Sequence, residues 1–343
     1  MNGDPILQVE NLAVHFQIQT GGIVGGKSLV LRAVDGVSFS LSPGETLGIV
    51  GESGCGKSTL GRAVLRLIEP TAGRVAWLGQ DFLDLDQNQL RAERRNIQII
   101  FQDPLASLNP RMTIGAIIAE PLITHEPRLS RAEIQARVED AMDQTGLLPS
   151  MINRYPHEFS GGQCQRVGIA RAMILRPQLI VCDEPVSALD VSIQGQIVNL
   201  LMKLQADFGL SLLFISHDLS IVRHISHRIL VLYLGKVMEI ASRDRLYQAP
   251  RHPYTQALIS AVPIPDPMLE RQKKRIVLEG DLPSPLDPPS GCIFRTRCRY
   301  AQDRCATEVP ALGPIDDGHE VACHFWCDLS AKTQRGAPQD QST

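Results

Sequence analysis

The sequence lacks several features that would place it in a familiar class of protein. No apolar run approaches the roughly 18 residues that a membrane-spanning helix needs. The first residues lack the basic start and the apolar stretch of a secretory signal. The formal net charge of the 343 residues is only −3, which gives no reason to expect nonspecific binding to nucleic acid. These absences predict a cytosolic protein that has no nucleic-acid ligand and meets a membrane only through a partner.

Aromatic residues are also few, at 5%, but 43% of the residues are hydrophobic. That content allows a sizeable core, and the length allows roughly two domains of about 150 residues. Strand patterns lie at residues 6–18 and 46–50, helical spacing extends from residue 112 to 173, and strands alternate with helices from residue 179. We therefore predict an α/β fold in which a helical insertion interrupts a parallel sheet. Ser130 and Glu133 form a capping-box pattern within the insertion.

A glycine-rich loop, residues 51–58, follows the apolar stretch 46–50 and precedes a helical pattern that begins near Thr59. This order is the setting of a phosphate-binding loop, in which backbone N–H groups converge on phosphate oxygens at the positive end of a helix. Lys57 is predicted to reach the β- and γ-phosphates, and the Ser58 hydroxyl is predicted to bind Mg²⁺. The loop by itself leaves kinases, GTPases and ATPases open.

Two further stretches contain candidate functional residues. Asp183 and Glu184 end an apolar stretch, where the first carboxylate would orient the Mg²⁺ shell and the second would polarise an attacking water. Ser160 and the glycines after it precede a helical pattern and so predict a second anion site at a helix N-terminus. Because this site cannot easily reach the phosphate of the first loop within one chain, the sequence indicates a dimer that shares nucleotide between subunits.

These motifs occur in the order found in ATP-binding-cassette (ABC) ATPases, and the chain resembles that family from about residue 7 to 260. The resemblance rests on the phosphate loop, Gln102, the signature residues 160–163, Asp183 with Glu184, residues 187–190, and Ser216 with His217. It implies the fold of a P-loop ABC ATPase domain, which has a mixed sheet core, an antiparallel β subdomain and a helical subdomain, here followed by a small cysteine-rich C-terminal segment. It also implies that two cassettes enclose two ATP molecules head to tail. It also implies that Glu184 is the general base, that Gln102 senses Mg²⁺, water and the transporter, and that His217 contacts the γ-phosphate.

The resemblance thus assigns catalysis to Glu184, His217, Gln102 and Lys57, and Mg²⁺ binding to Ser58, Gln102 and Asp183. The nucleotide contacts that it implies are Phe16, Gly51, Glu52, Ser53, Gly54, Cys55, Gly56, Lys57, Ser58, Thr59, Gln102, Ser160, Gly161, Gly162, Gln163, Asp183 and Asp190. Phe16 is the candidate for stacking on adenine. Its interpretation as an ordinary core residue of a strand is nearly as good.

Three longer stretches, residues 101–113, 154–166 and 252–255, resemble the narrower family of peptide and nickel importer cassettes. That resemblance implies an ATPase that powers oligopeptide import from the cytoplasmic face of the bacterial inner membrane. Its partners would be a second related cassette, two membrane-spanning permeases and an extracytoplasmic peptide-binding protein, with the helical insertion docked on a permease. Dipeptide and nickel import stay open, and a soluble cassette of DNA repair or translation is the more remote alternative.

The eight cysteines fall into two groups. Three are scattered along the chain, and five crowd into its last fifth, without the paired CxxC spacing of a zinc ribbon: Cys55, Cys164 and Cys182, then Cys292, Cys298, Cys305, Cys323 and Cys327. Four thiolates in a proline-bounded segment can hold zinc or an iron–sulfur cluster. The pattern from Gly291 to Cys298 resembles the C-terminal region of peptide-importer cassettes. That resemblance implies a structural 4Fe–4S cluster, or alternatively zinc, on Cys292, Cys298, Cys305 and Cys323, and leaves Cys327 spare. Cys164 is interpreted as a tolerated side chain.

The resemblance and the composition together predict the domain limits. They are an ATPase domain (1–262, with a helical subdomain at about 104–175), a proline-rich linker (263–290), a cysteine-rich region (291–330) and a disordered tail (331–343).

Overall fold

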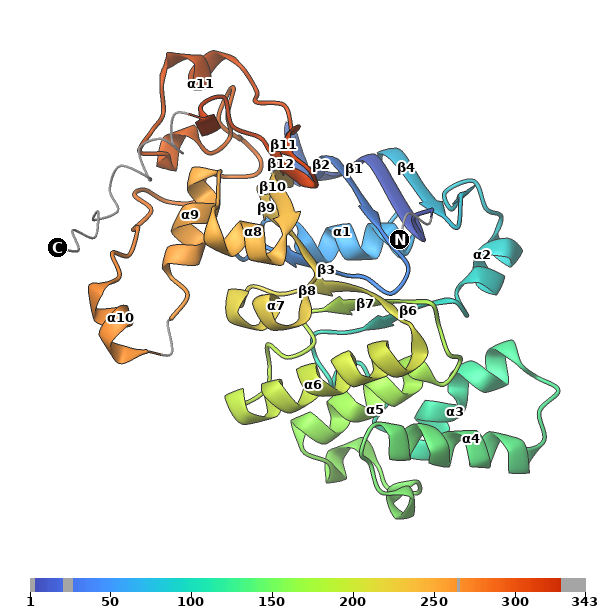
Figure 1. Ribbon diagram of the computed structural model, residues 1–343. Coiled ribbons are helices and arrows are strands. Elements are labelled where there is room, and N and C mark those ends of the chain that lie inside the picture. Colours follow the sequence, from blue (N-terminus) through green and yellow to red (C-terminus); the bar gives the residue numbers. More distant parts are fainter. Residues whose placement is uncertain (1–3, 21–26, 264–265, 328–343) are drawn as a thin grey trace.

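The structure is a computed structural model that describes residues 4–20, 27–263 and 266–327 (Figure 1). Its strands are β1 (Leu7–Thr20), β2 (Lys27–Leu41), β3 (Thr46–Val50), β4 (Ala72–Trp77), β5 (Gln80–Asp81), β6 (Ile97–Ile100), β7 (Leu179–Asp183), β8 (Ser211–Ile215), β9 (Arg228–Tyr233), β10 (Lys236–Ser242), β11 (Gly313–Asp316) and β12 (His319–Val321). Its α-helices are α1 (Lys57–Val64), α2 (Gln87–Glu93), α3 (Ile114–His125), α4 (Arg131–Gln144), α5 (Gly161–Met173), α6 (Val191–Phe208), α7 (Leu219–Ile225), α8 (Arg243–Gln248), α9 (Pro253–Ser260), α10 (Pro267–Gln272) and α11 (Asp303–Thr307).

The larger sheet has the strand order β11-β12-β10-β9-β3-β8-β7-β6 and is parallel from β9 to β6. Every residue of β3, β7 and β8 is buried, as a parallel sheet covered on both faces requires. The strand predicted at residues 46–50 is confirmed. Only β8 separates β3 from β7, so the loops that follow these two strands leave the same edge of the sheet, where ligands of α/β folds bind.

A smaller antiparallel sheet, in the order β2-β1-β4-β5, lies on the other side of α1 (Figure 1). α1 contacts β1 and β2 of this sheet as well as β7 and β8 of the larger one. One apolar cluster combines side chains from both sheets and the helix. Because α1 is enclosed by two sheets, the loop that precedes it has a fixed position.

The predicted helical insertion forms α3, α4 and α5, which pack around an apolar cluster of their own. The capping box at the start of α4 is confirmed, since Ser130 Oγ accepts a hydrogen bond from Glu133 N at 3.3 Å and Glu133 Oε2 accepts one from Ser130 N at 2.8 Å. In Figure 1 these helices lie at the opposite end of the molecule from the C-terminal segment. The insertion therefore forms a separate lobe below the edge of the parallel sheet.

The cysteine-rich C-terminal segment, described over residues 291–327, is attached to the larger sheet. β12 pairs with β10, and Ile293 and Phe294 join the apolar cluster on one face of the sheet. The stretch 263–290, predicted to be a proline-rich linker, contains the helix α10. This six-residue helix begins at Pro267, and proline is favourable at the first helical position because its fixed φ is already helical. The predicted disordered tail, 331–343, lies outside the described residues.

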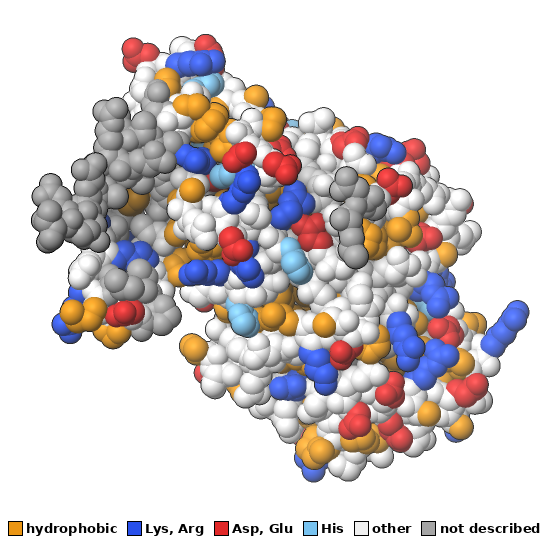
Figure 2. All heavy atoms as spheres, viewed as in Figure 1, with side chains coloured by type: hydrophobic (Ala, Val, Ile, Leu, Met, Phe, Trp, Pro, Cys, Tyr) orange, Lys and Arg blue, Asp and Glu red, His pale blue; other side chains and the backbone are white. Residues whose placement is uncertain are grey.

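The surface agrees with the nearly balanced composition. On the face shown in Figure 2, acidic and basic side chains are interspersed over both lobes. Within the described residues, no helix has both the length and the apolar character needed to cross a membrane.

Candidate nucleotide site

The loop 51–58 joins β3 to α1 and closes around the Lys57 side chain. Lys57 is only 4% exposed, and its Nζ donates to the carbonyl oxygens of Gly51 at 2.9 Å and Glu52 at 3.0 Å. A Cβ atom at Gly51 would lie 2.1 Å from a neighbouring carbonyl oxygen, and one at Gly56 would lie 2.0 Å from another. Glycine is therefore needed at both positions so that the loop can pass this close to other backbone segments.

A cavity of about 330 Å³ opens beside this loop, within the size range of ligand pockets in proteins. It is lined by most of the loop and also by Phe16, Gln102 and Glu184, which come from three other parts of the chain. Phe16 is 37% exposed, which argues against the alternative that it is a core strand residue. Its stacking on adenine stays a prediction.

Ser58 and Asp183, two of the predicted Mg²⁺ ligands, are in direct contact. Ser58 Oγ donates to Asp183 Oδ1 at 2.6 Å, and Arg62 Nη2 lies 3.3 Å from the other carboxylate oxygen. Asp183 is 1% exposed at the end of β7. A hydroxyl and a carboxylate are oxygen ligands of the kind that Mg²⁺ takes together with phosphate and water, so this pair fits the ion. Gln102, the third predicted ligand, does not join the pair here and contacts Glu184 instead.

Three side chains converge on Glu184, the predicted general base. Gln102 Nε2 donates to Glu184 Oε2 at 3.1 Å, His217 Nδ1 lies 3.3 Å from the same oxygen, and Lys57 Nζ lies 4.0 Å from Oε1. The backbone of Glu184 is in the left-handed region, with φ of 47°, a strained conformation that is common at functional sites. The carboxylate is thus held in one orientation at the edge of the cavity.

The signature residues 160–163 lie apart from this cavity, and none of them is among the residues that line it. Ser160 is exposed at the start of α5, where its backbone N donates to Gln163 Oε1 at 2.9 Å. Asp190 is exposed at the start of α6, and its carboxylate makes no capping hydrogen bond. Cys164 is fully buried, and burial raises the pKa of its thiol, so a reactive thiolate is disfavoured there.

The chain is similar to known sequences and structures. The profile of the family described as ABC transporter matches residues 34–187, and that of the oligopeptide/dipeptide transporter C-terminal region matches residues 238–305. The oligopeptide transport ATP-binding protein OppF of Salmonella typhimurium is 61% identical over 320 residues, which cover 93% of this chain and 95% of that protein. The chain belongs to the ABC transporter family.

Other members of the family support the assignment. The oligopeptide transport ATP-binding protein AppF of Bacillus subtilis is 53% identical over 326 residues, covering 95% of this chain and 98% of that protein. The dimeric structure of the ABC transporter cassette MJ0796 superposes with a TM-score of 0.62 at 30% identity, covering 69% of this chain and 98% of that chain. The predicted ABC ATPase fold is confirmed, and the chain is an ABC ATPase.

The cysteine-rich segment of this ABC ATPase gives no support to the predicted metal centre. Among the described residues, no group of three or more histidine, cysteine, aspartate or glutamate side chains could hold a metal ion. Burial, and after it the charges of the neighbouring cysteines, raise the pKa of the Cys298 thiol to about 11 and that of Cys323 to about 12. A bound metal would displace the thiol protons, so these raised pKa values do not bear on whether a metal is held. Because no metal-binding group is found among the described residues, the expectation of a 4Fe–4S cluster or zinc at Cys292, Cys298, Cys305 and Cys323 has no support.

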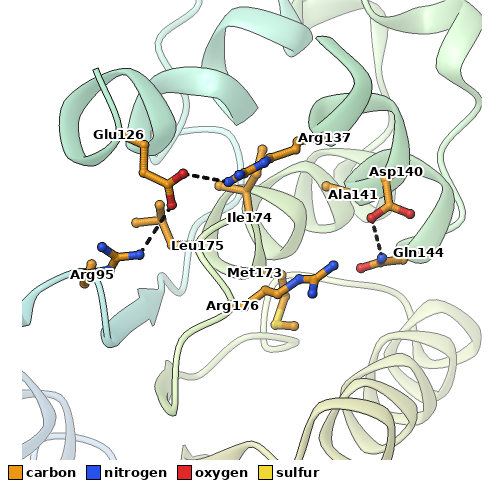
Figure 3. Close-up of a pocket in the computed structure, with 10 residues that line it drawn as sticks. All are labelled: Arg95, Glu126, Arg137, Asp140, Ala141, Gln144, Met173, Ile174, Leu175 and Arg176. Atoms are coloured by element: carbon orange, nitrogen blue, oxygen red, sulfur yellow. Dashed lines mark hydrogen bonds and ion pairs between the residues drawn. The ribbon is translucent and has the colours of Figure 1, made fainter. Parts of the chain in front are cut away.

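A second cavity, of about 340 Å³, lies among α4, the end of α5 and Arg95. Figure 3 shows Glu126 between two guanidinium groups, 3.3 Å from Arg95 and 2.8 Å from Arg137. None of the predicted nucleotide contacts lines this cavity. Because it contains none of those contacts, the cavity is not a second candidate for the nucleotide.

Sequence reasoning missed two residues that contact the phosphate loop from the C-terminal side. Arg297 forms a two-pronged ion pair with Glu52, at 2.7 and 3.2 Å, and the Tyr254 hydroxyl accepts a hydrogen bond from Glu52 N at 2.9 Å. Both residues lie inside stretches that carry the resemblance, 252–255 and 291–298. The signal was therefore present, but only the path of the chain shows that these stretches reach the loop.

Proposed function

We propose that this ABC ATPase is the ATP-hydrolysing subunit of a bacterial oligopeptide importer. The observation that carries the proposal is the convergence of Gln102, His217 and Lys57 on Glu184 beside the cavity. The cargo is supported by relatives named as oligopeptide transport ATP-binding proteins, which match more than nine-tenths of the chain. The match of residues 238–305 to the oligopeptide/dipeptide C-terminal region supports it further.

Each side chain at the cavity has a distinct task in hydrolysis. Glu184 accepts the proton of the attacking water, and Gln102 and His217 orient its carboxylate. Ser58 and Asp183 would hold Mg²⁺, which offsets the negative charge of the phosphate oxygens when it is bound. Lys57 gives up its hydrogen bonds to the loop carbonyls in favour of phosphate. Phosphoryl transfer needs positioning and charge stabilisation above all, and these groups supply both.

The second half of the site would come from a partner cassette. Residues 160–163 present the start of α5 to solvent, away from the cavity of their own chain. In the proposed assembly they contact the nucleotide of a second, related ABC ATPase, and removal of the γ-phosphate weakens the dimer. Two permeases and an extracytoplasmic peptide-binding protein complete the importer. The helical subdomain, about 104–175, would contact a permease at the cytoplasmic face of the inner membrane.

Uptake of a labelled pentapeptide tests the proposal in cells that lack the chromosomal gene and carry either the native gene or its Glu184→Gln form. Glu126→Gln is the matched control, because it makes the same chemical change outside the nucleotide cavity. We expect uptake that needs Glu184, tolerates Glu126→Gln and resists an excess of unlabelled dipeptide.

The outcomes separate the alternatives. Uptake that is abolished by excess dipeptide would favour a dipeptide cassette. Pentapeptide uptake indifferent to Glu184, with nickel uptake dependent on it, would favour a nickel cassette. A chain that purifies without an integral membrane partner would favour a soluble cassette.

A further inference from the structure

Each polar group of Glu52, the second residue of the phosphate loop, has a partner. Its carboxylate accepts two hydrogen bonds from Arg297, at 2.7 and 3.2 Å. Its N–H donates to the Tyr254 hydroxyl at 2.9 Å, and its carbonyl oxygen accepts from Lys57 Nζ at 3.0 Å. Glu52 therefore connects the lysine that would bind phosphate to a residue 245 positions further along the chain.

Arg297 is well placed to hold this carboxylate. Its side chain is only 9% exposed. Burial favours loss of its proton, but the hydrogen bonds to the Glu52 carboxylate oppose that effect and its pKa is raised, so the guanidinium stays charged. The neighbouring Phe294 ring lies 5.3 Å from the Tyr233 ring and 5.4 Å from the Tyr254 ring, measured between centroids. These aromatic contacts fix the backbone around Arg297, so that its planar fork meets the carboxylate at both oxygens.

The charge of Glu52 is unfavourable for a loop that binds a polyanion. It is the only acidic side chain between Gly51 and Ser58. Its side chain lines a separate cavity beside α9 and is not among the residues that line the nucleotide cavity. Arg297 thus keeps the carboxylate turned away from the nucleotide cavity and cancels its charge.

We propose that Arg297 is a positioning residue of the nucleotide site. It fixes the position of Glu52 in the phosphate loop, and it neutralises the acidic side chain of the loop. ATP affinity then depends on the docked C-terminal segment, and by reciprocity bound ATP stabilises that docking by the same factor. The inference goes beyond the proposed function and does not depend on which solute is transported.

Equilibrium binding of MgATP to the full-length chain tests this role. We expect Arg297→Gln to weaken binding about tenfold, within the usual range of coupling between sites. Arg297→Lys, which keeps the charge and loses the fork, should lie between it and the native chain. The double variant Glu52→Gln/Arg297→Gln should bind MgATP more tightly than Arg297→Gln alone, because no unpaired carboxylate is left in the loop.

Arg299→Gln is the matched control. Arg299 is exposed two residues further on, with its guanidinium carbon 4.7 Å from the centre of the Tyr300 ring, and its loss should leave MgATP affinity unchanged. Hydrogen exchange at residues 292–298 gives a second readout. MgATP should slow this exchange in the native chain and in Arg299→Gln, and should slow it less in Arg297→Gln.

Three results would overturn the proposal. The first is that folded Arg297→Gln and Arg297→Lys bind MgATP as tightly as the native chain. The second is that Arg299→Gln loses as much MgATP affinity as Arg297→Gln. The third is that the double variant binds MgATP no more tightly than Arg297→Gln. If Arg297→Gln does not fold, Arg297→Lys and the double variant carry the test. If the native chain binds MgATP but supports no peptide uptake, that result counts against the proposed function and not against the role of Arg297.

Discussion

The phosphate loop and the cysteine-rich segment both consist of residues that bind charged ligands, but their ligand groups are in opposite states. At the loop, Lys57 is buried as a cation among carbonyl oxygens, and Ser58 already contacts Asp183. In the segment, burial keeps the thiols of Cys298 and Cys323 protonated. The difference shows that a loop followed by a helix brings its own backbone N–H groups to a ligand.

The segment instead contacts the nucleotide machinery through its other residues. Phe294 packs among the aromatic rings beside β9, and Arg297 pairs with Glu52. The comparison therefore separates a site that binds the nucleotide from a region that supports that site. Four predictions test this contrast, from the largest expected effect to the smallest.

Glu184→Gln should have the largest effect. We expect the rate of ATP hydrolysis by the assembled transporter to fall by about 10²- to 10⁴-fold, because glutamine cannot accept the proton of the attacking water. MgATP binding should be retained, since the side chain keeps its shape. Phosphate release under single-turnover conditions measures the rate, with Glu126→Gln as control. If Glu184→Gln hydrolysed ATP at the native rate, Glu184 would not be the general base.

Lys57→Ala should weaken MgATP binding about 10- to 100-fold, as expected for losing charge-assisted hydrogen bonds at a buried position. Equilibrium binding to the full-length chain measures the loss. Lys203→Ala, an exposed lysine on α6, should bind normally. If both variants bound MgATP like the native chain, the phosphate loop would not be the nucleotide site.

His252, at the start of α9, allows a test where the two regions meet. Burial lowers the pKa of His252 from 6.5 to about 4, although the charge of Glu239 opposes this. The neutral ring is therefore favoured by folding, and this stability should be lost as pH falls from about 6.5 to 4, at a cost of about 3 kcal/mol. Thermal unfolding between pH 7 and 4 measures it.

His252→Asn keeps a side-chain acceptor for the N–H of Tyr254 but cannot take up a proton, so its stability should fall less in acid. The exposed His224→Asn is the control and should follow the native chain. Equal acid sensitivity in all three proteins would show that His252 is not the group responsible.

The smallest effect concerns the thiols and is confined to the segment. Burial raises the pKa of Cys298 and Cys323 from 9.0 to about 11 and 12, so the folded segment favours the protonated forms. Their contribution to docking is complete below pH 9 and should be lost as pH rises towards 12. In a Trp77→Phe variant, Trp326 is the remaining tryptophan, and its fluorescence should report the change.

Replacing both cysteines with serine should remove that transition. Stoichiometric iron or zinc in the purified chain, without any transition up to pH 12, would show that the thiolates hold a metal. Such a result would break the contrast between the two regions, because coordinated thiolates carry no proton.

Much of the fold follows from local pattern. The buried strand 46–50 is a short apolar run, and Ser130 with Glu133 signals the start of α4; both appear as predicted. The helix α10 does not, because the density of prolines around it concealed that Pro267 is at a position where proline favours a helix. The addition of β12 to the larger sheet was also not predictable, since short edge strands carry little pattern.

By itself, the sequence determined the phosphate loop, the strand that precedes it and the identity of the candidate catalytic residues. These features are encoded within a few consecutive residues, where backbone sterics and apolar spacing act locally. Only the tertiary structure decided which distant groups meet: Phe16 at the cavity, Gln102 on Glu184, and Arg297 on Glu52. Such contacts depend on how the whole chain packs, because pairing across 245 residues leaves no periodic signal in the sequence.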